Sequence, residues 1–284
     1  SVIPPYGLHG AAQDDGKQPH EGLLHNPLHR TNAKTVHAHS PGLAKGESAL
    51  TLSRMIHFTL FGIPVYIRPS FWVVLAIFGG ALSINSVEGL IYPALFVIAG
   101  FVAILSHEMG HALVGRRLGG GQQTIVLELF GGLTSSHGMQ LTRGGRALMI
   151  LAGPMMTLLL GIISLWITWN IVAPVMTAHN LTFWDLAISP FTAAAISPQL
   201  YILSCLIMIG EWWTILNLLP IYPLDGGQLI AQFIRSPKKV FMTGFITSII
   251  IGLLSFQLFH GYFIPNSMAL FAYSNYREYR NAPF

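Results

Sequence analysis

The sequence predicts an all-α polytopic membrane protein, with about six transmembrane helices and a small β-hairpin or re-entrant element between the second and third helices. Composition is the first reason, because 52% of the 284 residues are hydrophobic and only 9% are charged, whereas a soluble domain carries about 25% charged residues. The second reason is a series of long apolar segments separated by polar intervals. The third is that Lys and Arg occur only in alternate intervals.

Charge and cysteine content exclude two classes of site. The formal net charge is +4 and the isoelectric point is about 9.3. The basic residues are spread over loops and form no patch, so nucleic-acid binding is not expected. The single cysteine, Cys205, lies in an apolar stretch. An intrachain disulfide and a cysteine-based zinc site are therefore excluded.

Residues 1–54 differ from the rest of the chain. They hold six of the twelve histidines together with many Pro, Gly and polar residues, and they show no apolar periodicity. This composition is typical of a disordered segment, and it lacks the apolar core of a signal peptide. We therefore expect a disordered N-terminal extension over residues 1–54, either native or added, and a folded membrane domain over residues 55–284.

The folded domain is expected to begin with a short strand or an interfacial segment over residues 55–68, where β-branched and aromatic residues surround Gly62 and Pro64. Six apolar segments follow it. The first is weakened by Gly79 and Gly80, and the sixth is shorter than the others. We expect membrane spans over residues 70–86, 90–114, 146–172, 199–219, 240–260 and 263–276.

The interval over residues 119–146 is polar and rich in glycine. Its apolar piece, residues 124–130, is followed by Gly131 and Gly132, and alternation around a Gly-Gly turn favours a β-hairpin. Such a hairpin would offer an edge strand to an extended substrate, although a plain connecting loop fits the same residues. Residues 173–198 also predict a loop.

The placement of Lys and Arg predicts the orientation of the spans. No Lys or Arg lies between Arg146 and Arg235. With six spans, every basic interval falls on the same side of the membrane as the N-terminus. The positive-inside rule makes that side cytoplasmic.

The second apolar segment ends in the pentapeptide His107-Glu108-Met109-Gly110-His111. In a helix, His107 and His111 lie on one face and can hold one metal ion, and Glu108 lies where its carboxylate can take a proton from a metal-bound water. A charged side chain in hydrocarbon costs about 2.5–3.5 kcal/mol on the mildest scales. Three ionisable residues in five positions therefore indicate a metal site inside the bilayer or at its edge. The alternative, a helix end with snorkelling side chains, normally uses Lys or Arg.

A third ligand must be an acidic residue or a histidine near the same membrane face. Asp225 follows the fourth span, level with the histidines, in a segment with two prolines and two glycines. Irregular backbone at membrane depth is tolerated where protein or a water cavity surrounds it. We favour Asp225 as the ligand, the alternative being that it caps a following helix. Glu128, whose surroundings predict a strand, and Glu211, in the middle of the fourth span, are the other candidates.

Four short motifs connect the sequence to a known family. They are HEMGH at 107–111, FGG at 130–132, AGP at 152–154 and NLLPIYPLDGG at 217–227. Together they resemble the motifs of the site-2 protease family of intramembrane zinc metalloproteases. The resemblance extends from about Met55 to the end of the chain. The six-span arrangement and the ending YREYR most resemble the compact sporulation-type branch of that family.

The resemblance implies a role for each motif residue. His107, His111 and Asp225 would bind one zinc ion, and Glu108 would be the general base. Asn217 would position the substrate or stabilise the oxyanion. The implied enzyme is a zinc metalloendopeptidase that cleaves transmembrane segments of membrane-tethered proteins, a reaction known as regulated intramembrane proteolysis.

The resemblance also implies surroundings and partners. We expect a multi-pass protein of a bacterial plasma membrane, with its active site near the cytoplasmic side. The lipid bilayer and a membrane-spanning protein substrate would be its partners, and a regulatory membrane partner is compatible with the sequence. We expect neither a PDZ-type insert nor a CBS-type regulatory domain, which leaves the control of substrate access open.

Two other functions are kept as alternatives. A membrane-bound zinc protease of the glutamate-ligand type would use Glu128 or Glu211 as its third ligand and would cut soluble or misfolded segments. A metal transporter would use the histidine pair as a transit site. Such a transporter would keep passing metal without the Glu108 carboxylate, whereas a protease would not cleave without it.

Overall fold

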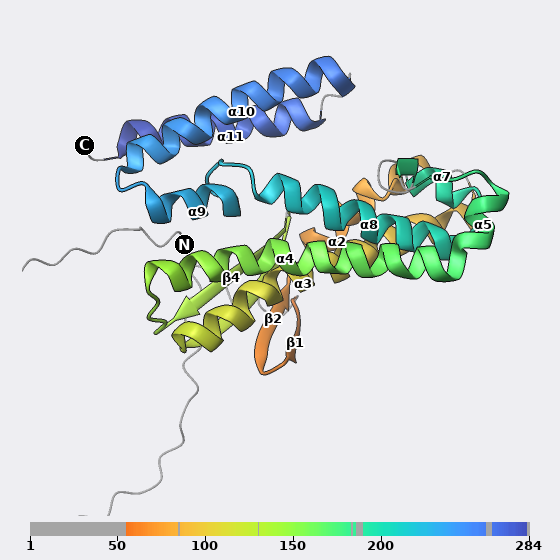
Figure 1. The fold of residues 1–284 in the computed structure, drawn as a ribbon, viewed down its shortest axis with the longest axis horizontal. Helices are drawn as coiled ribbons and strands as arrows, with labels where there is room; N and C mark the ends of the chain where they lie inside the picture. The colour runs from red at the N-terminus through yellow and green to blue at the C-terminus, as the bar shows by residue number, and fades with distance from the viewer. Residues whose placement is uncertain are drawn as a thin grey trace, which may run out of the picture. The chain divides into compact units, whose positions relative to one another are not determined.

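Apolar helices and one small sheet make up the part of the chain that the computed structural model describes (Figure 1). The structure describes residues 55–84, 86–129, 131–182, 184–185, 190–259 and 263–282. The expected N-terminal extension, residues 1–54, lies outside them, as does Phe130 of the FGG motif. The boundary between extension and folded domain therefore stays a prediction.

Four of the described helices are long and apolar enough to cross a membrane. They are α3 (Ile91–Gly119), α4 (Arg143–Ile167), α8 (Pro198–Asn217) and α10 (Pro237–Phe259). A π-helical turn, η3 (Thr168–Val172), continues α4. These helices coincide with the second to fifth predicted spans, within a few residues at each end.

The first predicted span is shorter than expected. Helix α2 (Pro69–Phe78) has ten residues, which extend about 15 Å, or half the hydrocarbon thickness of a bilayer. It ends at Gly79 and Gly80, and Gly80 has a φ of 86°, in the left-handed region. Two short 3-10 helices, η1 (Ala81–Ser83) and η2 (Glu88–Leu90), then lead into α3.

The chain beyond the third and fifth spans also departs from expectation. The predicted loop over residues 173–198 contains two short helices, α5 (Ala173–Ala178) and α7 (Pro190–Ala194). The last helix, α11 (Phe263–Asn281), is longer than its predicted apolar segment because its polar end continues the helix. It packs along α10, and Asn275 Nδ2 of α11 donates a hydrogen bond to the carbonyl oxygen of Tyr222 at 2.6 Å.

The strands form one four-stranded sheet in the order β1-β2-β3-β4. They are β1 (Ile56–Leu60), β2 (Ile63–Ile67), β3 (Gln122–Glu128) and β4 (Gly131–His137). Both β1–β2 and β3–β4 are antiparallel, whereas β2 and β3 are parallel, with Val65 opposite Ile125. The sequence pattern favours the β3–β4 pair, although Gly131 and Gly132 lie in β4 and not in a turn. It predicts a single strand at most over residues 55–68, so it gives neither the β1–β2 pair nor the parallel pair, whose strands are separated in the chain by α2 and α3.

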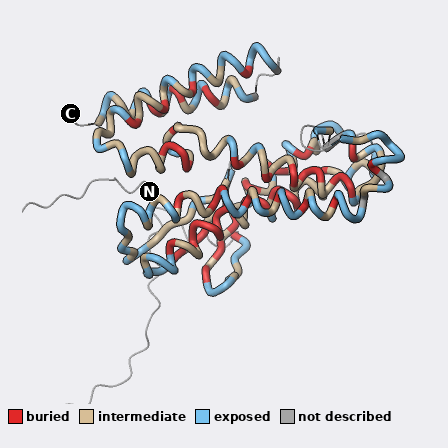
Figure 2. The backbone as a smooth tube through the Cα atoms, viewed as in Figure 1, coloured by how far each residue is buried: buried red, intermediate tan, exposed pale blue. Residues whose placement is uncertain are grey.

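The sheet packs its apolar side on the helix that carries the HEMGH motif. Alternate residues of β2 and β3 are buried, as period-2 alternation requires. They contact α2 and the middle of α3, and Figure 2 shows buried stretches on these elements in red. The cluster contains Ile63, Val65, Ile67, Phe71, Leu75, Ile104, Met109, Ala112, Ile125 and Leu127.

Helices α3 and α4 approach each other most closely at the two short motifs that they carry. A Cβ atom added to Gly110 would overlap the backbone carbonyl of Ala152. The fourth position of HEMGH is therefore a contact position, which brings the first half of α4 against both histidines. Small residues at such positions are what allow helix backbones to approach in a membrane.

We predict that Gly110→Ala destabilises the protein, because the obstructing atom is backbone and has no rotamer to change. The expected cost is about 1–3 kcal/mol, measured as a lower melting temperature in detergent. Gly144→Ala is the matched control, since an added Cβ at this helical glycine meets nothing within 4 Å. It should leave the melting temperature equal or slightly higher. Equal effects of the two variants would contradict the close α3–α4 contact.

Candidate metal centre

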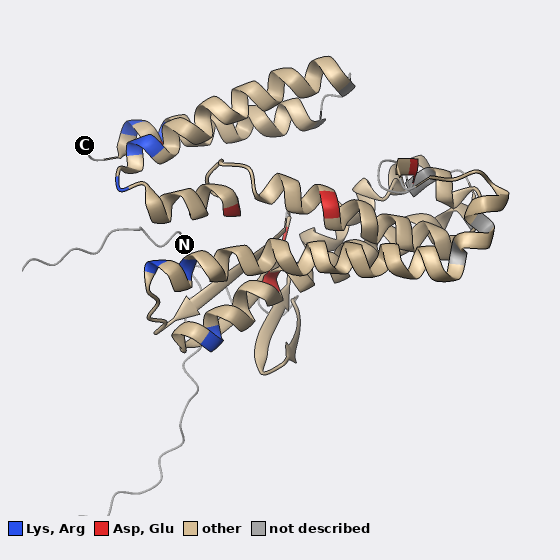
Figure 3. Ribbon diagram, in the orientation of Figure 1, with Lys and Arg blue, Asp and Glu red and all other residues tan. Residues whose placement is uncertain are grey.

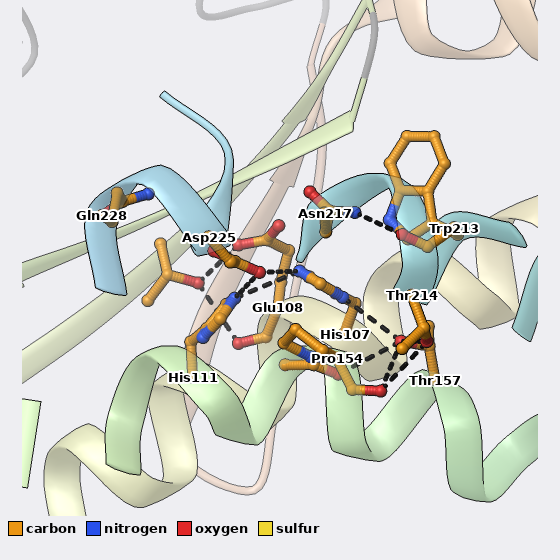
Figure 4. Close-up of polar contacts among 12 residues, drawn as sticks. His107, Glu108, His111, Pro154, Thr157, Trp213, Thr214, Asn217, Asp225 and Gln228 are labelled. Atoms are coloured by element: carbon orange, nitrogen blue, oxygen red, sulfur yellow. Dashed lines mark hydrogen bonds and ion pairs between the residues drawn. The ribbon is translucent and has the colours of Figure 1, made fainter. Parts of the chain in front are cut away.

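Two histidines one turn apart on α3 point at the same place (Figure 4). His107 is 3% exposed and His111 is 9% exposed. Their Nε2 atoms lie 3.1 Å apart. The helix geometry expected from the i, i+4 spacing is therefore present, and both ring nitrogens face a shared space.

The other nitrogen of each ring contacts helix α4. His111 Nδ1 lies 2.8 Å from the carbonyl oxygen of Met149, and His107 Nδ1 lies 3.3 Å from Thr157 Oγ1. A carbonyl oxygen can only accept, so His111 Nδ1 is the donor in its bond. For a neutral ring this assigns the lone pair to Nε2. The same assignment at His107 leaves Thr157 free to donate its own proton to the carbonyl of Gly153 or Pro154.

Asp225 completes the group from a distant part of the chain. Its Oδ2 atom lies 3.0 Å from His107 Nε2 and 3.4 Å from His111 Nε2. One ligand atom from each of the three residues lies within 4.8 Å of the other two. In Figure 4 the three side chains converge from α3 and from α9 (Asp225–Phe233).

Asp225 is not a helix cap. It is the first residue of α9, the N-cap position belongs to Leu224, and no side chain accepts a capping hydrogen bond there. The two glycines that follow explain how the helix begins so close to the preceding loop. A Cβ atom at Gly226 would overlap the carbonyl of Leu218, and one at Gly227 would overlap the backbone of Ile221. The DGG sequence therefore lets the loop fold back over the start of α9.

The donor set fits a zinc ion. Two imidazole lone pairs and one carboxylate oxygen face each other in a buried space, and Asp225 Oδ2 has no hydrogen-bond donor among the described residues. Three converging acceptors without a donor favour a cation between them. Two His nitrogens and one acidic oxygen are an established three-residue ligand set for catalytic zinc.

Glu108 lies beside this group without belonging to it. It is 6% exposed, and its Oε2 atom accepts a hydrogen bond from Thr134 Oγ1 of strand β4 at 2.7 Å. Its carboxylate is therefore within the same buried region but is held from the sheet side. A carboxylate in this position could transfer a proton beside the candidate metal site.

The AGP motif shapes the floor of the site. A Cβ atom at Gly153 would overlap the ring of His111, so glycine leaves the space that the imidazole occupies. Thr214 of α8 also contacts this region. Its Oγ1 atom lies 2.6 Å from the carbonyl oxygen of Gly210, 3.1 Å from that of Pro154 and 3.2 Å from Thr157 Oγ1. Helices α3, α4 and α8 are thus joined by polar contacts around His107.

The remaining predicted site residues lie outside the three-residue group. Asn217 is the last residue of α8, and its Nδ2 donates to the carbonyl of Trp213 at 3.0 Å. Glu128 forms an ion pair with Arg68 at 3.1 Å. Glu211 is half-buried on α8, and the ligand group around the histidines contains neither glutamate.

Sequence reasoning missed the hydroxyl residues that support the site. Thr134, Thr157 and Thr214 each contact a motif residue or each other. Thr157 and Thr214 carried a usable signal, since each is a hydroxyl residue inside a predicted membrane span. Thr134 carried none, because its partner depends on how the sheet packs on α3.

Comparison with known proteins connects this geometry to a family. The model of peptidase family M50 matches residues 95–259, which include both histidines and Asp225. A protein named as a zinc metalloprotease of Methanocaldococcus jannaschii is 27% identical over 174 residues, covering 61% of this chain and 43% of that protein. A protein of Synechocystis sp. is also 27% identical, over 184 residues, covering 62% of this chain and 43% of its own length.

A solved structure shares the fold. The structure described as a site-2 protease from Methanocaldococcus jannaschii aligns with a TM-score of 0.52 and 23% sequence identity, covering 81% of this chain and 97% of that one. The chain spans less than half the length of the two relatives described above. The family match covers more than half of this chain, which confirms the family resemblance seen in the motifs. This chain belongs to peptidase family M50.

Proposed function

We propose that this chain is a zinc metalloendopeptidase of the site-2 protease type, which cleaves membrane-spanning segments of protein substrates. The observation that carries the proposal is the convergence of His107, His111 and Asp225, with Glu108 beside them, at the end of an apolar helix of membrane length. The family and the name of the zinc metalloprotease relative support zinc as the ion and proteolysis as the reaction.

The residues divide the chemistry of peptide hydrolysis between them. His107, His111 and Asp225 would hold the ion, leaving a further position open. Zinc, when bound, lowers the pKa of a coordinated water to about 7 and polarises a carbonyl oxygen. Glu108 would take one proton as the water oxygen bonds to the scissile carbon, and would return it to the leaving nitrogen as the C–N bond breaks.

The sheet supplies a place for an extended substrate. Strand β4 pairs with β3 along one edge and is the last strand in the order of the sheet. A substrate strand could add to its other edge by backbone hydrogen bonds. A transmembrane helix would have to unwind first, because its carbonyls are engaged within the helix. Asn217 has a second amide proton beyond the one given to Trp213, and we assign it to the substrate or the oxyanion.

The basic residues support an orientation with the site near the cytoplasmic face. Lys and Arg gather at one end of the described helices (Figure 3), with Arg116 and Arg117 ending α3 and Arg143 beginning α4. We propose that the chain crosses the membrane six times. The four long apolar helices make four of these crossings, α11 makes the fifth, and α2 together with the 3-10 helix η1 makes the sixth. On this topology the positive-inside rule places the metal centre toward the cytoplasm of a plasma membrane.

We predict that Asp225→Asn removes most bound zinc and all measurable cleavage of a single-span reporter in detergent. The amide keeps the shape of the side chain but offers a neutral and weaker ligand. Zinc is measured by metal analysis of the purified protein. Glu128→Gln and Glu211→Gln make the same chemical change elsewhere and should keep zinc. Loss of zinc in either of these two, with zinc kept in Asp225→Asn, would favour the glutamate-ligand protease.

A second prediction concerns the general base. Glu108→Gln should retain zinc and lower the rate of cleavage by about 10²–10⁴-fold or more, because the amide cannot accept the proton. Metal content and cleavage are measured on the same preparation. Zinc passage into vesicles gives the competing outcome: a transporter would pass zinc in both the wild type and this variant, and neither would cleave the reporter.

A third prediction concerns Asn217. We expect Asn217→Leu to lower kcat by about 10²–10³-fold, the usual cost of losing one oxyanion donor, with zinc content unchanged. Asn170→Leu is a close control, because Asn170 Nδ2 donates to the carbonyl of Trp166 four residues earlier, as Asn217 does to Trp213, and Asn170 lies in the turn after α4. An equal loss of kcat in both variants would mean that Asn217 serves only its hydrogen bond within the helix.

A further inference from the structure

Strand β4 faces the helix that carries Glu108 with two of its alternate residues. Gly132 and Thr134 are two positions apart, so they lie on the same face of the strand. Thr134 Oγ1 lies 2.7 Å from Glu108 Oε2 and 3.2 Å from the backbone carbonyl oxygen of Glu108. Both contacts involve Glu108, the one ionisable residue of HEMGH that lies outside the three-residue metal group.

A threonine hydroxyl has one proton to donate, so the two acceptors compete for it. The carboxylate oxygen is nearer, and charged acceptors form the shorter and stronger bonds. The carbonyl of Glu108 lies in the middle of α3, where backbone N–H groups already supply donors. The proton of Thr134 therefore belongs to Oε2.

Gly132 constrains the same side chain sterically. A Cβ atom at this position would overlap Cγ of Glu108 and would lie 2.7 Å from Glu108 Oε1. The side chain of Glu108 thus runs across the bare backbone of Gly132 and ends at the hydroxyl of Thr134. The space left by Gly132 and the hydrogen bond from Thr134 together favour one orientation of the Glu108 carboxylate.

We infer that Thr134 is a positioning residue for Glu108: its hydroxyl holds Oε2 in place, so that Oε1 is the oxygen left to take the proton. The inference rests on the proposed role of Glu108 as general base. It also joins two functions in one strand, because the strand proposed to receive the substrate is the strand that aligns the base. Thr134 would then affect the chemical step and leave metal binding to the other residues.

The test compares Thr134→Val, Thr134→Ser and wild type with zinc bound, using cleavage of a single-span reporter in detergent. Valine keeps the shape of threonine without the hydroxyl, and serine keeps the hydroxyl. A hydrogen bond to a charged group supports an expected loss of about 10–100-fold in kcat for Thr134→Val. Zinc content, melting temperature and KM should stay near the wild-type values, and Thr134→Ser should recover most of kcat.

Thr124→Val is the matched control. It removes a hydroxyl from the neighbouring strand β3, away from Glu108, and should leave kcat unchanged. If Thr134→Val lowers the melting temperature, Thr134→Ala replaces it as the variant without a hydroxyl. Loss of zinc or of folding in both would make Thr134 a structural residue and overturn the inference. Wild-type kcat in Thr134→Val, or a serine variant as slow as the valine one, would also overturn it.

Glu108→Gln is measured alongside to distinguish failure of the base role of Glu108 from failure of the positioning role of Thr134. If this variant keeps zinc and loses cleavage, the base role stands and the Thr134 variants decide the positioning role. If it still cleaves at the wild-type rate, the base role fails and the inference fails with it. With the base role intact, Thr134→Val in the Glu108→Gln background should slow residual cleavage far less than it slows the wild type.

Discussion

The structure depends on the approach of two histidine nitrogens and one carboxylate oxygen in a buried space. His107 and His111 come from α3 and Asp225 from the start of α9, more than a hundred residues later in the chain. Such groups are costly to bury unless each has a partner. The outer nitrogen of each ring contacts α4, and the inner atoms face one another in an arrangement that suits a cation.

This requirement accounts for the small residues in the motifs. Gly110 lets α3 approach Ala152 of α4, Gly153 leaves room for the ring of His111, and Gly226 lets the loop after α8 return to the start of α9. None of these glycines is needed for a turn with positive φ. Each stands where a side chain would separate elements that the three ligands need close together.

The sequence predicted the local parts of this arrangement better than the distant ones. The lengths of the apolar segments were enough to predict α3, α4, α8 and α10. The i, i+4 spacing of His107 and His111 was enough to place both rings on one face of a helix. Asp225 could be selected from its position after the fourth span. The length of α2 was overestimated, because hydropathy counts apolar residues and gives little weight to Gly79 and Gly80.

Contacts between elements that are distant in sequence could not be predicted in the same way. The parallel pairing of β2 with β3 depends on the path of α2 and α3 between them. The contact of Thr134 with Glu108 depends in turn on that sheet packing against α3. A pattern of alternating residues can predict that a strand exists, but it does not contain the identity of the helix that the strand covers.

The residues that contact the proposed metal ligands and those that contact the proposed base come from different directions. The carbonyl of Met149 and the hydroxyl of Thr157, both from α4, contact the outer nitrogens of the histidines, whereas β4 contacts Glu108. A movement of strand β4 would therefore displace Glu108 directly, whereas the histidines are in contact with α4. In the proposed enzyme, a substrate strand added to β4 would act on the element that aligns Glu108 and leave the ion in place. Metal binding and alignment of the base would then be separable properties of one site.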